Sequence, residues 1–178
     1  VCDPGRVDPG DDDFPGLNCL DFKHPEVREE RFALIEETLN QYPIDGFELQ
    51  LNYAPYYFHP DEVNAGCEIM TEWIERVYKA VKASGGEREL AIRIPADIKG
   101  CLDIGVDLRE WIRRGIVDVL IGQSFSGPEL LDSMADFLPL VEAAKGSRVR
   151  VHAAIQSHVD SDRLGEATIE MIRGAACN

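Results

Sequence analysis

Short segments of this chain alternate apolar and polar residues with the two-residue period of a β-strand. The clearest example spans residues 44–51, and its alternating positions are Phe47, Glu48, Leu49, Gln50, Leu51 and then Asn52. Because successive side chains of a strand point to opposite faces, this pattern predicts one apolar face and one polar face. A strand in a doubly covered parallel sheet is apolar on both faces, so the pattern favours a strand that turns polar groups toward a cleft.

The same alternation recurs in segments 89–95 and 148–155. In the first, Arg93 lies opposite an apolar face, and in the second His152 does so, with Gln156 just beyond it. A further strand is predicted at 117–122, and it can present either Gln123 or Ser124 to the cleft.

Helices are predicted between these strands, because apolar residues there recur at a spacing of three or four. Residues 25–42 begin with Pro25 and have acidic residues in the first turn, which is typical of a helix N-terminus. The other predicted helices are 68–83, 108–114, 128–144 and 162–175. Strands that alternate with helices at about thirty residues per unit indicate βαβ units and a parallel sheet.

Two architectures fit such a chain, an open doubly wound sheet and a (β/α)8 barrel. No glycine-rich dinucleotide or phosphate-binding motif follows a strand, so no cofactor is expected and the open sheet is disfavoured. A barrel typically needs about 250 residues. We therefore predict an α/β fold, a partial (β/α)8 TIM-type barrel of about four parallel strands with covering helices, over 19–178 and incomplete at both ends. Residues 1–18, rich in Pro, Gly and Asp, are predicted to form a surface loop.

The polar residues of these strands are predicted to gather at the carboxyl ends, where barrel enzymes place their sites. Glu48 is the catalytic candidate. The substrate-binding candidates are Gln50, Asn52, Tyr53, Arg93, Gln123, His152 and Gln156. Amides pair with hydroxyl groups and aromatic rings offer flat faces to sugar rings, so this set predicts a carbohydrate ligand. Further aromatic candidates are Tyr56, Tyr57, Phe58 and Trp111.

Each of these residues also has a structural interpretation. Glu48 and Arg93 could form a structural ion pair, and His152 could be a hydrogen-bonded core residue. The aromatic residues at 53–58 are either exposed for binding or buried under a neighbouring segment. Trp111 is expected to pack in the core rather than to serve as a platform.

Composition excludes several classes of function. The 178 residues are 44% hydrophobic and 29% charged, which is typical of a globular domain. Eighteen basic and thirty-three acidic residues give a net charge of -15, which disfavours nucleic acids and anionic membranes. No apolar run is long enough to span a bilayer. The five cysteines form no C-x-x-C pair and have no histidine at metal-ligand spacing, so no metal is expected.

An ordered series of short blocks resembles the bacterial glycoside-hydrolase-like (β/α)8 barrels grouped with family-ten-like glycosidases. The blocks are His24–Arg28, Tyr42–Leu49, Ile92–Pro95, Gly105–Ile112 and Gly115–Asp118. The resemblance implies a carbohydrate-active barrel, often exported, that acts on a poly- or oligosaccharide.

The chain departs from that family after Glu48. The relatives commonly carry a further acidic residue and an arginine where Gln50 and Tyr53 stand here. Glycosidases generally use two carboxyl groups, and Glu48 is the one candidate evident on a cleft face. An active hydrolase and an inactive carbohydrate-binding barrel therefore both stay open, as does a metal-free lyase or isomerase on the same scaffold, because fold does not fix chemistry.

Overall fold

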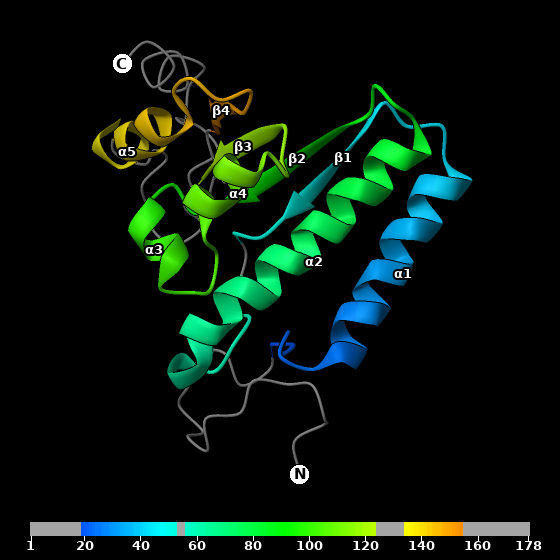
Figure 1. Ribbon diagram of the computed structural model, residues 1–178, viewed down its shortest axis with the longest axis horizontal. Helices are drawn as coiled ribbons and strands as arrows, with labels where there is room; N and C mark the ends of the chain where they lie inside the picture. The colour runs from blue at the N-terminus through cyan, green and yellow to red at the C-terminus, as the bar shows by residue number, and fades with distance from the viewer. Residues whose placement is uncertain (1–18, 53–55, 124–133, 155–178) are drawn as a thin grey trace, which may run out of the picture.

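The structure, a computed structural model, describes residues 19–52, 56–123 and 134–154. Its elements in chain order are α1 (Pro25–Gln41), β1 (Gly46–Gln50), the 3-10 helix η1 (Pro60–Glu62), α2 (Val63–Ser84), β2 (Glu89–Ile94), α3 (Ile98–Leu102), α4 (Leu108–Arg114), β3 (Val119–Gly122), α5 (Met134–Ala144) and β4 (Arg150–Ala153). Figure 1 shows this alternation of helices and strands.

The four strands form one sheet in the order β1-β2-β3-β4, and every neighbouring pair is parallel. The prediction of an α/β fold with about four parallel strands is therefore confirmed. Each predicted strand is present, although the observed strands are shorter at one or both ends. The strand order follows the chain order, as it does when every crossover turns the same way.

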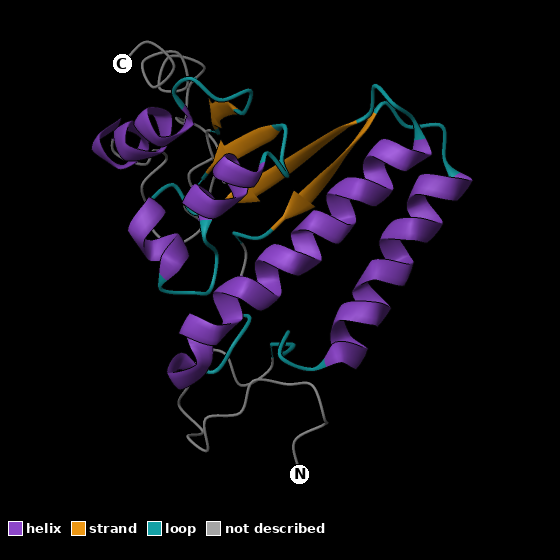
Figure 2. Ribbon diagram, in the orientation of Figure 1, coloured by secondary structure: helices purple, strands orange, loops and turns teal. Residues whose placement is uncertain are grey.

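The helix α2 lies along one face of the sheet, and α1 packs beside α2 on the side of β1 (Figure 2). The stripe of α2 that faces the sheet is fully buried, and it meets a fully buried apolar face of β2. The residues of these two surfaces are Met70, Ile74, Val77 and Val81 on α2 and Leu90, Ile92 and Ile94 on β2. Because the helices cover only the apolar face, the other face is left to the polar side chains.

The helices differ from the prediction in the start of α2 and in one additional short helix, α3. The helix predicted at 68–83 begins at Val63, because η1 starts at Pro60 and runs directly into it. The short helix α3 was not predicted; the side chain of Asp97 caps it by accepting from the amides of Lys99 and Gly100. The loop predicted at 1–18, the first part of the helix at 128–144 and the whole helix at 162–175 lie outside the described residues.

The ring of Phe58 is wedged between the start of α2 and the turn before α4. Phe58 is 3% exposed. A Cβ atom added to Gly66 would lie 2.5 Å from this ring, and one added to Gly105 would lie 2.6 Å from it. Only a residue without a side chain fits at these two positions, so the glycines fix how closely the loop after β1 approaches α2.

We predict that Gly105→Ala destabilises the protein more than Gly146→Ala does. Both glycines have positive φ, 84° and 79°, so both variants carry a backbone cost of about 1–2 kcal/mol. Only Gly105 is crowded, and overpacking there adds about 1–3 kcal/mol, whereas a Cβ at Gly146 meets nothing within 4 Å. Urea unfolding measures the free energy of unfolding of each variant. Equal losses of stability in the two variants would show that the Phe58 ring does not crowd position 105.

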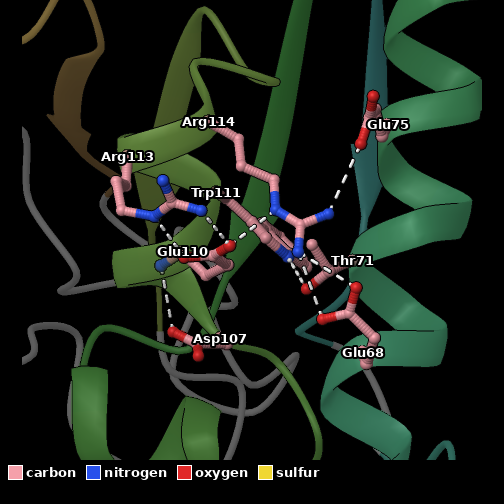
Figure 3. Close-up of polar contacts among 8 residues, drawn as sticks. All are labelled: Glu68, Thr71, Glu75, Asp107, Glu110, Trp111, Arg113 and Arg114. Atoms are coloured by element: carbon pink, nitrogen blue, oxygen red, sulfur yellow. Dashed lines mark hydrogen bonds and ion pairs between the residues drawn. The ribbon is translucent and has the colours of Figure 1, made fainter.

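A buried hydrogen bond and an exposed charge cluster join α2 to α4 (Figure 3). The indole of Trp111, fully buried, donates to the hydroxyl of Thr71 at 3.0 Å. Arg114 reaches from α4 to Glu68 and Glu75 of α2, at 3.0 and 3.5 Å. Within α4, the carboxylate of Glu110 accepts from both Arg113 and Arg114 at 2.6 Å, while its own amide donates to the capping side chain of Asp107 at 3.1 Å.

The hydrogen bonds from Arg113 and then Arg114 lower the pKa of Glu110 to about 2. A lowered pKa means that the ionised carboxylate stabilises the folded state above the ordinary pKa of 4.5, and that this stabilisation is lost as the pH falls toward 2. Glu110→Gln should therefore be less stable than the native protein at pH 5, and the gap should close by pH 2.

Urea midpoints of both proteins between pH 2 and pH 5 test this prediction. Glu87→Gln is the control, because it removes an exposed carboxylate that lies outside this cluster. A gap between Glu110→Gln and the native protein that persists unchanged at pH 2 would contradict it.

Candidate functional site

The polar face of the sheet is built by strand register. Gln50 pairs with Arg93, Arg93 with Ile121, and Ile121 with His152, so these positions form one row across the sheet. Glu48 lies two residues before Gln50 and therefore shares its face. Gln50 and His152 are exposed, and Arg93 is partly buried. The structure thus places the predicted polar residues of the three alternating strands on the face away from the helices.

Arg93 is the centre of a chain of contacts across three strands. Its Nε donates to Oε1 of Glu48 at 2.7 Å, and its Nη1 donates to Oε1 of Gln123 at 2.7 Å. The side chains of Glu48 and Arg93 are 44% and 23% exposed, so the pair faces solvent rather than the core. Of the two candidates after β3, Gln123 belongs to this chain of contacts, and Ser124 lies outside the described residues.

Asn52 ties the carboxyl ends of the strands together. Its Nδ2 donates to the carbonyl oxygen of Gln123 at 3.1 Å, across the end of β2. The backbone continues the tie, because the amide of Leu51 donates to the carbonyl of Arg93 and that of Gln123 donates to the carbonyl of Ile94. Asn52 is 2% exposed, and its Oδ1 has no hydrogen-bond partner among the described residues. The sequence offered no sign of this burial.

The aromatic residues near the site are mostly buried. Tyr57 is 9% exposed, its hydroxyl donates to the carbonyl of Leu51 at 2.7 Å, and burial raises its pKa. Of the two alternatives for this loop, burial is therefore correct for Tyr57 and Phe58. Trp111 is fully buried, so it is a packing residue, as expected. Tyr53 and Gln156 lie outside the described residues.

Two further carboxyl groups lie outside the chain of contacts around Arg93. Glu89 is on the polar face at the amino end of β2, where it forms an ion pair with Arg150. Asp21 precedes α1 and was not among the candidates; it is 6% exposed and accepts from the amide of Lys23 at 2.9 Å. Neither is paired with Glu48. Of the two acidic residues within the four described strands, Glu48 lies nearer the carboxyl ends than Glu89, and Asp97, beyond the end of β2, is engaged in capping α3.

A pocket of about 270 Å³ lies between α1 and the outer edge of β1. It is lined by Phe22, Arg31, Leu34, Ile35, Leu49, Gln50, Leu51, Tyr57 and Trp73. The ring of Phe22 packs edge-on against Tyr57 and Trp73, with centroids 5.6 and 5.1 Å away, and the Trp73 indole donates to the carbonyl of Arg28. Among the described strands β1 pairs with β2 alone. Residues at the carboxyl end of β1, Leu49, Gln50 and Leu51, line the pocket beside its other edge.

Over the described ranges, no three or more His, Cys, Asp and Glu side chains are grouped as a metal site would require. No helix in the same part of the chain is both long and apolar enough to cross a membrane. Comparison with known proteins finds no matching family model and no similar curated protein.

We predict a coupling energy of about 0.5–1 kcal/mol between Glu48 and Arg93, because the pair is partly exposed and water screens it. The coupling is measured by urea unfolding of Glu48→Gln, Arg93→Met and the double variant. The pair Glu89 and Arg150 is the matched control, since both side chains are 52% exposed and should couple less. Coupling of several kcal/mol would instead mark Glu48 and Arg93 as a buried structural pair.

Proposed function

We propose that this chain forms an arc of a (β/α)8 barrel and that the barrel is a glycoside hydrolase acting on a poly- or oligosaccharide. The arc is supported by the parallel order β1-β2-β3-β4, with helices on one face and polar groups on the other. A barrel has no sheet edges, and the pocket beside α1 borders the edge of β1 that no other described strand covers.

The function rests on one observation, the chain of contacts from Glu48 through Arg93 to Gln123 at the carboxyl ends of the strands. A carboxylate, a guanidinium and an amide side by side supply both acceptors and donors for sugar hydroxyl groups. Gln50 and His152, exposed on the same face, extend this surface. Buried apolar residues on the helix side keep these groups on a rigid support.

In this proposal Glu48 is the acid/base. As an acid it gives a proton to the oxygen of the leaving sugar as the glycosidic C–O bond breaks, and water supplies the hydroxyl that replaces it. A second carboxyl group completes the reaction. It comes from outside the four described strands, because Glu89 lies at their amino ends.

A second candidate function is carbohydrate binding without cleavage. The observation that favours it is the ion pair itself, because a single carboxylate held by Arg93 at 2.7 Å suits the binding of hydroxyl groups. Gln50, where the resembling family commonly has an acidic residue, points in the same direction.

We expect the intact protein to release reducing ends from at least one member of an oligosaccharide panel. Glu48→Gln should lower that rate by about 10²–10⁴-fold, the usual contribution of a general acid or base. Glu87→Gln is the control, since it removes an exposed carboxylate elsewhere on the chain. Binding without cleavage, unchanged in Glu48→Gln, would establish the binding protein instead, and neither binding nor cleavage would refute both.

A further inference from the structure

The carboxamide of Asn52 is only half satisfied although it is almost completely buried. Its Nδ2 donates to the carbonyl of Gln123, while its Oδ1 has no partner among the described residues. A buried acceptor without a donor costs free energy that an apolar side chain of similar size would avoid. A leucine here would avoid that cost, but it would remove the donor that Asn52 gives to the carbonyl of Gln123.

The contacts of Gln123 indicate what Asn52 does. The backbone of Gln123 is held twice, because its carbonyl accepts from Asn52 and its amide donates to the carbonyl of Ile94. Its side chain is held once, because Oε1 accepts from Nη1 of Arg93. With Oε1 turned to Arg93, the Nε2 group is directed elsewhere as a donor.

We propose that Asn52 is a positioning residue that holds Gln123 beside Arg93 and does not itself contact the ligand. Gln123 Nε2 and the remaining N–H groups of Arg93 then donate to an acceptor oxygen of the ligand. The Oε2 atom of Glu48, which Arg93 does not occupy, accepts from a neighbouring hydroxyl. The ligand class that presents both groups within this span is a sugar with adjacent hydroxyl oxygens. This inference deepens the proposed function and rests on it.

Asn52→Leu tests the inference, because it removes the donor to Gln123 while filling the same volume. In ¹⁵N–¹H NMR spectra, the side-chain amide signals of Gln123 and the Nε–H signal of Arg93 should shift in this variant. Asn64→Leu is the matched control: Asn64 is exposed on α2, and its variant should leave both signals unchanged. The melting temperature of Asn52→Leu checks that the variant remains folded.

The second readout is binding of the intact protein to the tightest oligosaccharide of the panel. Asn52→Leu should weaken binding about tenfold, the loss that corresponds to one misplaced hydrogen-bonding group. Unshifted Gln123 and Arg93 signals, or native affinity, would overturn the positioning role. If Asn52→Leu does not fold, Asn52→Ser, which shortens the side chain, carries the same test. Failure of both variants to fold would show a structural role and also overturn it.

Failure of the proposed function gives a different result. If the protein binds no oligosaccharide but the Gln123 and Arg93 signals still shift in Asn52→Leu, Asn52 does hold Gln123, and the carbohydrate ligand is wrong.

Discussion

The register between parallel strands is the constraint on which the candidate site depends. Arg93 can reach Glu48 on one side and Gln123 on the other because β1, β2 and β3 pair without a slip along their described lengths. A shift of one residue would turn the polar side chains of a strand into the helix layer and its apolar side chains to the open face. The buried apolar face of β2 opposes such a shift, so core packing and site geometry are enforced by the same pairing.

The helix layer keeps that register in place through contacts far from the polar face. α2 contributes the apolar stripe, and it is joined to α4 by Trp111 and by Arg114. The loop that follows β1 is fixed by Phe58 against two glycines, while the Tyr57 hydroxyl holds the carbonyl of Leu51. The carboxyl end of β1 is therefore held both by the Tyr57 and Phe58 loop and by the hydrogen bond from Asn52 to Gln123.

Much of the fold was readable from the sequence, because alternation and helical spacing are local signals. The faces of β1 and β2 followed directly from the residues around Glu48 and Arg93. Contacts between distant segments carry no such signal: nothing in the sequence pairs Arg114 with Glu68, or Asn52 with the backbone of Gln123. The aromatic loop shows the same limit, because exposed and buried tyrosines look alike until a neighbouring segment is placed over them.

The two tryptophans of the chain lie in different parts of this design. Trp73 lines the pocket beside the edge of β1 that no other described strand covers, whereas Trp111 is enclosed where α4 meets α2. Replacing either one by phenylalanine leaves a single indole whose fluorescence reports on one region alone. The molecule thus carries two built-in optical probes, one sensitive to what happens along the sheet edge and the other to separation of the helices that support the polar face.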